Sequence, residues 1–183
     1  MPPESNVPPQ IMRFIPNGER FITLIRRHLI GLIYIYLVVI AGLAALFAIG
    51  AMVAPDLLGG FSDQDFSILT LLTILVFVLV VLILIIVTNI YRHNSLVITD
   101  KETIQVLQRG VFQVKVSHLS HADIEDVTAE QNGLPATIFN YGTLHIETSG
   151  ELKNFAFSYC PDPTRYARVV LEARQKFAET TGG

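Results

Sequence analysis

Two long runs of apolar residues dominate the first half of the chain. They extend over residues 29–53 and 66–90, and neither contains Asp, Glu, Lys, Arg or His. An α-helix rises about 1.5 Å per residue and the hydrocarbon core of a bilayer is about 30 Å thick, so about 20 residues are enough to cross it. The second run is apolar on every side, unlike a surface helix of a soluble domain. The pattern predicts an α-helical membrane hairpin with spans at about 29–53 and 66–90.

Two other interpretations of these runs are disfavoured by length. A helix in the core of a soluble protein is usually shorter than 66–90. A cleaved signal peptide has a shorter apolar region than 29–53, and that region begins closer to the start of the chain. Small residues in the first span share one helical face, where the backbone of another helix can approach closely: Ala41, Ala44, Ala48 and Ala51. The other helix is either the second span or part of a second copy.

Charged residues around the two spans predict their orientation. The loop between them, 54–65, contains Asp residues and neither Lys nor Arg. Basic residues flank the outer end of each span: Arg13, Arg20, Arg26 and Arg27 before the first, and Arg92 with His93 after the second. Lys and Arg are concentrated on the cytoplasmic side of membrane proteins. We therefore expect a multi-pass protein of the cell (cytoplasmic) membrane, with both termini in the cytoplasm and the bilayer as a partner.

The rest of the chain alternates apolar and polar residues over short stretches. This texture predicts strands at 95–99, 103–109, 111–116, 124–131, 143–149 and 152–159, with a loop or helical turn at 134–140. Alternation is cleanest where Leu144, Ile146 and Thr148 point to one side of a strand. Phe155, Phe157 and Tyr159 share a face in the same way. Closely spaced strands with short turns predict an antiparallel sheet or a small barrel.

The two ends of the chain complete the expected organisation. The proline-rich residues 1–18 predict a flexible tail, and a helical pattern begins at Glu19. Near the other end, Asp162 is an expected N-cap followed by Pro163 at the first helical position. The helix has one apolar stripe, made of Tyr166, Val169, Val170, Ala173 and Phe177. We expect three parts: the tail 1–18, a transmembrane hairpin 19–91 and a cytoplasmic domain 92–183.

Several stretches of the chain resemble a known family. The opening Glu19-Arg20 and Arg26-Arg27-His28 are similar to the start of bacterial membrane proteins with a PH-like domain, the YdbS-like group. Further stretches resemble that domain in order and spacing: LVITD at 96–100, DIEDV at 123–127, FNYGTLHIET at 139–148 and NFAFSYCPDP at 154–163. The resemblance implies a PH-like antiparallel β-barrel or sandwich, capped by a C-terminal helix and held at the cytoplasmic membrane face. It carries over no catalytic or cofactor-binding residues.

Few residues have a pattern that indicates chemistry. His118, His121 and Asp123 form H-x-x-H-x-D, which could bind a divalent metal if a turn gathered them. The alternative, which we favour, is a polar connection between two strands. Cys160 is the only cysteine and is expected to be a small packing residue, whereas Gly142 is expected to avoid a clash that a Cβ would cause. We therefore expect no catalytic residue, cofactor or metal, and no enzyme.

Two function classes remain after this survey. From residue 91 onward acidic residues outnumber basic ones, so a nucleic-acid partner is not expected. The first class is an interaction or assembly module that binds a protein partner or copies of itself, through an open sheet edge or the groove beside the C-terminal helix. The alternative is a module that binds lipid headgroups. Basic residues are scattered along the domain's sequence, which favours the first class.

The predicted orientation can be tested with the single cysteine. A membrane-impermeant thiol reagent is expected to leave Cys160 unlabelled in intact cells, because the domain that carries it lies in the cytoplasm. Labelling of denatured protein in opened membranes controls for burial of the thiol. Labelling of intact cells from outside would contradict the orientation.

Overall fold

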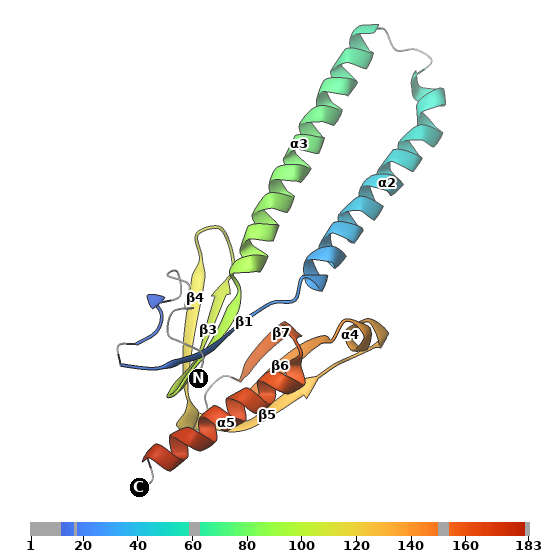
Figure 1. Cartoon of the computed structure of the whole chain (residues 1–183). Coiled ribbons are helices and arrows are strands. Elements are labelled where there is room, and N and C mark those ends of the chain that lie inside the picture. Colours follow the sequence, from blue (N-terminus) through green and yellow to red (C-terminus); the bar gives the residue numbers. More distant parts are fainter. Residues whose placement is uncertain (1–11, 17, 59–62, 150–153, 182–183) are drawn as a thin grey trace. The chain divides into compact units, whose positions relative to one another are not determined.

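The computed structural model describes residues 12–16, 18–58, 63–149 and 154–181 (Figure 1). Internal contacts divide the chain into two compact units. One unit, here called the helical unit, comprises residues 31–89. The other, here called the domain unit, contains the described residues up to 30 and from 90 onward.

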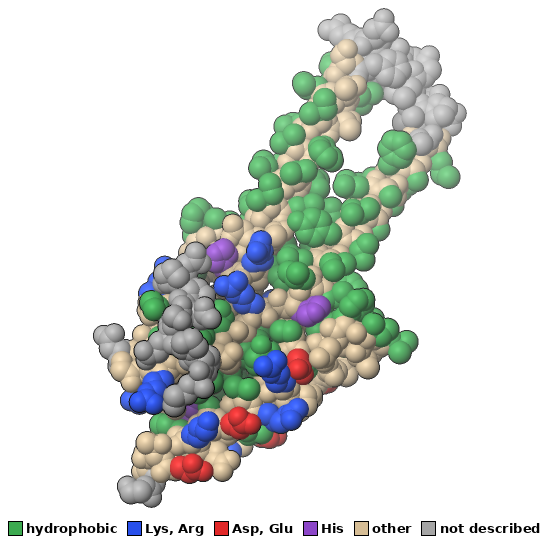
Figure 2. All heavy atoms as spheres, in the orientation of Figure 1, with side chains coloured by type: hydrophobic (Ala, Val, Ile, Leu, Met, Phe, Trp, Pro, Cys, Tyr) green, Lys and Arg blue, Asp and Glu red, His purple; other side chains and the backbone are tan. Residues whose placement is uncertain are grey.

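Two long helices form the helical unit, as predicted. Helix α2 extends over Ile30–Leu58 and helix α3 over Asp63–His93. Both contain a segment long and apolar enough to cross a membrane, Ile30–Gly50 and Ser67–His93. Figure 2 shows apolar side chains along the surfaces of both helices, as expected for groups that face lipid. The hydroxyl of Thr73 donates to the carbonyl of Leu69 at 2.8 Å, so this polar group needs no partner outside its own helix.

The small-residue face of α2 is not buried against α3. Ala41, Ala44 and Ala48 are exposed, and a Cβ added at Gly42 or Gly50 would meet no atom within 4 Å. A hydrogen bond of 2.8 Å does join the Tyr36 hydroxyl to that of Thr88. Packing of the small face against the second span is therefore not observed, and its use in self-association stays a prediction.

Seven strands in two antiparallel sheets make up most of the domain unit. The first sheet has the order β1-β2-β3-β4 and the second β5-β6-β7. The strands are β1 (Phe21–Arg26), β2 (Ser95–Thr99), β3 (Glu102–Gln108), β4 (Val114–Ser120), β5 (Ile124–Glu130), β6 (Tyr141–Thr148) and β7 (Phe155–Pro161). The other elements are the 3-10 helix η2 (His121–Asp123), α4 (Leu134–Ile138) and α5 (Pro163–Thr181). Among the described residues the two sheets do not close into one barrel, and side chains of both sheets share one core, as expected for a PH-like fold.

Strand β1 corrects the prediction of a helix from Glu19. Its residues pair antiparallel with β2, and Arg26 lies opposite Ser95. The β-branched residues Ile22, Thr23 and Ile25 favour a strand, and Ile25 is fully buried in the core. The pattern from Glu19 predicts a helix, but pairing with a strand some seventy positions later in the chain decides otherwise. The membrane hairpin is thus inserted between two neighbouring strands of one sheet.

The side chains found in the core confirm most of the predicted buried faces of the strands and of the C-terminal helix. Leu144, Ile146 and Thr148 are buried on one side of β6, and Phe157 in β7 is 1% exposed. Helix α5 covers β5 and β6 with its apolar stripe, in which Val170 and Ala173 are buried. The predicted N-cap is also present, since the backbone N–H of Arg165 donates to the Asp162 carboxylate at 3.3 Å.

Strand β4 begins later than predicted and ends later. The sequence predicts a strand at 111–116, whereas β4 is Val114–Ser120. The backbone N–H of Arg109 donates to the carbonyl of Gln113 at 2.9 Å, which closes a tight turn at the tip of the β3–β4 hairpin. Phe112 lies in that turn and is 97% exposed.

A second, smaller core lies on the other face of the first sheet. It contains Val97, Ile104 and Val106, and Phe14 and Ile15 pack against it. Both Phe14 and Ile15 belong to the segment predicted to be a flexible tail, so part of that segment is held on the sheet. Residues 1–11 and 17 of the tail lie outside the described residues.

The burial of Phe157 can be tested against an exposed phenylalanine. Phe157→Ala is expected to lower the free energy of unfolding by about 3–5 kcal/mol, because it leaves a cavity in the core. The matched control Phe112→Ala is expected to change it by less than about 0.5 kcal/mol, because that ring is exposed. Denaturant unfolding of the full chain in detergent, followed by circular dichroism of the β-sheets, measures both. Equal effects of the two substitutions would contradict the observed core.

Candidate functional site

One end of the two sheets carries the chain to and from the spans, and we call it the stem end. There β1 ends at Arg26, opposite the start of β2 at Ser95. The tip of the β3–β4 hairpin is at this end, because the backbone N–H of Gln108 donates to the Asn94 side chain at 2.6 Å. The second sheet reaches it too, since the N–H of His28 donates to the carbonyl of Tyr159 at 2.6 Å. The opposite end, with the β2–β3 turn, is the distal end.

Aromatic rings and a guanidinium group gather at the stem end. This stem cluster consists of Arg27, His28, Tyr91, Tyr141 and Tyr159. The Tyr91 hydroxyl donates to the His28 carbonyl at 2.6 Å. The Tyr141 ring stacks on both His28 and Tyr159, with centroids 5.8 and 5.9 Å apart. These contacts tie the segment that leads into α2, the last turn of α3 and the second sheet to one another.

Arg27 is the charged member of the stem cluster. Its guanidinium carbon lies 5.7 Å from the centre of the Tyr91 ring and 5.9 Å from that of Phe157. Burial lowers the pKa of Arg27, while Tyr91 and Tyr159 oppose the shift. An arginine nevertheless keeps its charge in proteins. Its Nε is buried and has no hydrogen-bond partner among the described residues, so the cation is held chiefly by aromatic faces. The cluster offers a fixed positive charge and no nucleophile.

Gly142 allows the close approach of two strands at this end. A Cβ at Gly142 would collide with the carbonyl oxygen of Glu130 in β5, as the sequence analysis anticipated. Three non-glycine residues nearby have positive φ, namely Asn140 (49°), Tyr159 (56°) and Asp162 (40°). Such backbone conformations are uncommon outside glycine. Packing around the stem cluster therefore fixes the backbone in conformations that isolated segments would avoid.

The distal end contains a buried histidine. His121 in η2 is fully buried, its Nε2 lies 3.3 Å from the Thr103 hydroxyl, and its ring meets that of Phe177 edge-on. Burial lowers the pKa of His121, and the neighbouring Asp100 and Glu102 oppose this only in part. The Nδ1 atom has no hydrogen-bond partner among the described residues. His121 is therefore a neutral packing residue at neutral pH.

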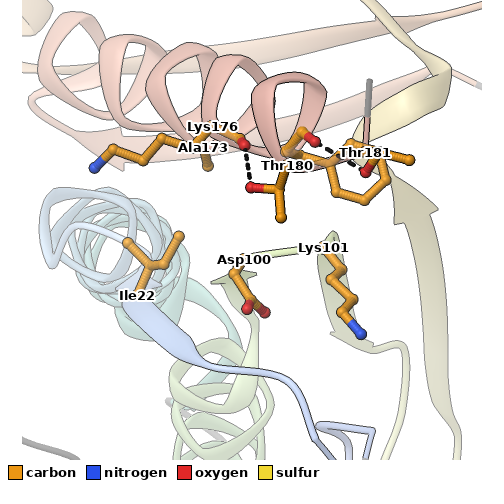
Figure 3. Close-up of a pocket in the computed structure, with 8 residues that line it drawn as sticks. Ile22, Asp100, Lys101, Ala173, Lys176, Thr180 and Thr181 are labelled. Carbon is orange, nitrogen blue, oxygen red and sulfur yellow. Dashed lines mark hydrogen bonds between the residues drawn. The ribbon is translucent and has the colours of Figure 1, made fainter. Parts of the chain in front are cut away.

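A shallow pocket of about 150 Å³ lies beside the last turns of α5 (Figure 3). Ile22, Ala173 and Phe177 give it an apolar floor, and the charged rim is Asp100, Lys101 and Lys176. The hydroxyls of Thr180 and Thr181 are used within the helix, where they donate to the carbonyls of Lys176 and Phe177. Sites for small molecules usually have volumes of about 300–1,000 Å³. This pocket is large enough for a side chain of a partner and too small for a typical cofactor.

The residues of the H-x-x-H-x-D pattern do not come together. His118 lies in β4, where its Nδ1 is 2.8 Å from the Glu102 carboxylate, while His121 points into the core. No group of three His, Cys, Asp or Glu that could hold a metal ion is found within the described residues. The favoured alternative, a polar connection between strands, is also wrong in detail, because His118 belongs to a strand and His121 is buried. Cys160 is buried as well, and burial together with Asp162 raises the pKa of its thiol to about 12.

The fold sorts charges that are scattered along the sequence. At the stem end basic residues outnumber acidic ones: Arg26, Arg27, Arg92, Arg109, Lys115 and Arg165 against Glu130 and Asp162. At the distal end the balance is reversed: Glu19, Asp100, Glu102, Asp123, Glu125, Asp126, Glu147 and Glu179 against Arg20, Lys101, Arg174 and Lys176. Antiparallel strands produce this arrangement, because each turn returns the chain to the same end. Basic residues that are scattered along the sequence are therefore more frequent at one end of the fold.

Strand β4 forms an open edge of the first sheet. Among the described residues it pairs with β3 alone, over seven residues without a bulge. The other sheet edges are covered in part, since β1 contacts β7 and α5 packs on β5. The outward part of β4 is exposed at Val114, Lys115 and His118. An unpaired, regular edge can accept another strand through main-chain hydrogen bonds.

Sequence reasoning missed two features of these surfaces. The exposed tip at Phe112 was assigned to a strand, although the preceding Gly110 indicates a turn. The large apolar side chains of α4, Leu134 and Ile138, and that of Phe139 directly after it are also exposed, whereas Ala136 is buried. A short segment rich in apolar residues is ordinarily buried, so no local signal distinguishes these side chains from core.

Two antiparallel sheets packed with a C-terminal helix, together with two helices able to cross a membrane, define a membrane-anchored protein with a PH-like domain. The family model for the bacterial PH domain matches residues 21–175, from the first residue of β1 into α5. The chain therefore belongs to the bacterial PH domain family. Neither a curated protein nor a solved structure was found to match it.

The burial of His121 predicts a loss of stability in acid. Because the pKa of His121 is lower in the folded protein than its ordinary value of 6.5, unfolding takes up a proton at mildly acidic pH. The free energy of unfolding is expected to decrease as the pH falls below about 6.5. His121→Gln should remove this part of the pH dependence, whereas the exposed control His118→Gln should retain it. Denaturant unfolding between pH 8 and pH 5 measures the difference, and an unchanged acid dependence in His121→Gln would contradict it.

Proposed function

We propose that this protein is a non-catalytic interaction module of the cytoplasmic membrane, with its PH-like domain and both termini in the cytoplasm. The positive flanks of the spans support this orientation. The pairing of β1 with β2 supports it further, because both ends of the inserted hairpin must emerge on the same side of the bilayer. The folded domain we propose comprises residues 92–183 together with β1, whose Ile25 belongs to the core.

The open edge of β4 is the observation that carries this proposal. An extended segment of a partner protein placed beside β4 would continue the sheet from β3 outward. The exposed side chains of Val114 and Lys115 would then contact that segment on opposite faces of the sheet. The edge has neither a proline nor a bulge, two of the features that usually prevent such pairing, although Lys115 places one charge on it. Nothing comparable supports catalysis: His118 and His145 are paired with carboxylates, and His121 and the thiol are buried.

A lipid-headgroup-binding module is the second candidate function. The excess of Arg and Lys at the stem end supports it, because each basic residue near an anionic bilayer contributes about 1 kcal/mol. We rank it second because this charge is accounted for by the flanks of the spans, where positive residues set orientation. The two candidates share Lys115, whereas His118, farther along β4, belongs to the docking edge alone.

The β4 edge is expected to contact protein in native membranes. A photo-crosslinking residue at Lys115 should yield an adduct heavier than the chain, because a partner strand would lie beside it. The same residue at Glu172, exposed on α5, serves as the matched control and should yield none. Mass spectrometry of the adduct identifies the partner strand or, at twice the mass of the chain, a second copy.

Hydrogen exchange provides an independent measure of the same contact. Backbone amides of β4 should exchange more slowly in native membranes than in the purified protein, because a partner would occupy those that point away from β3. Rapid exchange of β4 in both preparations, together with no adduct at Lys115, would contradict the proposed docking edge.

A further inference from the structure

Two loops of the domain unit expose large apolar side chains. The tip of the β3–β4 hairpin carries Phe112, which is 97% exposed, next to exposed Val111 and Val114. Helix α4, between β5 and β6, carries Leu134 at 78% and Ile138 at 72% exposure. Clustered apolar side chains of this size on a surface usually mark a contact with a protein or a membrane.

Both loops lie at the stem end. The hairpin tip follows Gln108, whose N–H bonds to Asn94, and Asn94 comes directly after the last residue of α3. The α4 loop leads into Tyr141, whose ring stacks on His28, two residues before α2 begins. Loops that are 20 residues or more apart in the sequence are thus brought to the two points where the chain enters and leaves its spans.

The surroundings of the hairpin tip match a membrane interface. Arg109 and Lys115 flank the apolar residues of the tip, and both are exposed. Apolar side chains bordered by Lys and Arg are typical of segments that lie in the boundary between headgroups and acyl chains. Tyrosines are enriched at the same depth, and the half-buried Tyr141 and Tyr159 lie at this end of the domain unit.

We propose that the β3–β4 tip and helix α4 insert into the interfacial region of the bilayer that α2 and α3 cross. The domain would then rest on the membrane by its stem end, with its acidic distal end in the aqueous phase. We favour the bilayer over a protein as the contact of these loops. The spans begin at Ile30 and end at His93, so the chain itself holds the residues next to them at the bilayer surface. This inference goes beyond the docking of a partner at β4 and does not depend on it.

Environment-sensitive fluorophores can test the insertion in the full chain. The protein is reconstituted into vesicles of phosphatidylcholine and phosphatidylglycerol, with the dye attached to a cysteine introduced as Val111→Cys or Thr137→Cys. Both changes keep Phe112, Leu134 and Ile138 in place. Ala122→Cys, exposed at the distal end, is the matched control. The chain without an introduced cysteine measures background labelling at Cys160, which is buried.

Insertion predicts opposite quenching at the two ends. At Val111 and Thr137 the emission should shift to shorter wavelength, with strong quenching by a spin label in the lipid headgroup or upper acyl chain and little by iodide. At Ala122 the pattern should be reversed. The additional substitutions Phe112→Asp and Leu134→Asp, both at exposed positions, should restore iodide quenching at Val111 and Thr137 respectively without changing the stability of the domain.

Three other results of the quenching experiment would each contradict the proposed insertion. Iodide quenching at Val111 and Thr137 equal to that at Ala122 would place the loops in water. Shielding from both iodide and lipid quenchers would show a contact with protein instead. Lipid quenching that disappears at high salt would show attraction between charges and headgroups without insertion, because salt screens exposed charges and leaves apolar burial intact.

Discussion

The pairing of β1 with β2 is the constraint on which the rest of this structure depends. Neighbouring strands lie about 4.8 Å apart, so Arg26 and Ser95 hold the two ends of the segment between β1 and β2 side by side. If this segment crosses a membrane, it must do so an even number of times, and it contains two helices of sufficient length. Separating β1 from β2 would cost free energy, because the Ile25 side chain of β1 is part of the main core. A segment that lies before the membrane spans in the sequence is thereby an integral strand of the domain that follows them.

Antiparallel topology then decides which residues share a surface. Every second turn of the sheets returns to the stem end, which brings the hairpin tip at Phe112, the α4 loop and the flanks of the spans together. The same rule gathers basic side chains at this end and acidic ones at the other. A domain with little net charge thus has two ends of opposite charge character.

The polar groups that suggested chemistry are used for structure. His118 pairs with Glu102 across two neighbouring strands, and His145 pairs with Glu130 in the same way. His121 fills the space between η2, β3 and α5, and Cys160 packs in the core beside Phe157. What the domain presents to its surroundings is a strand edge, a small pocket and two apolar loops. These are features of binding surfaces, which is why we assign the protein an interaction role.

The sequence by itself determined the features that depend on local pattern. Two charge-free runs specified the helices, strict alternation specified the buried face of β6, and Asp162-Pro163 specified the start of α5. These signals are local because helix and strand periodicities are properties of consecutive residues. Only the tertiary structure decided that 21–26 is a strand, that H-x-x-H-x-D is divided between an edge and the core, and that Leu134 and Ile138 of α4 are exposed. Each of these outcomes depends on which distant segment lies alongside, and contacts over such separations are not encoded in the spacing of neighbouring residues.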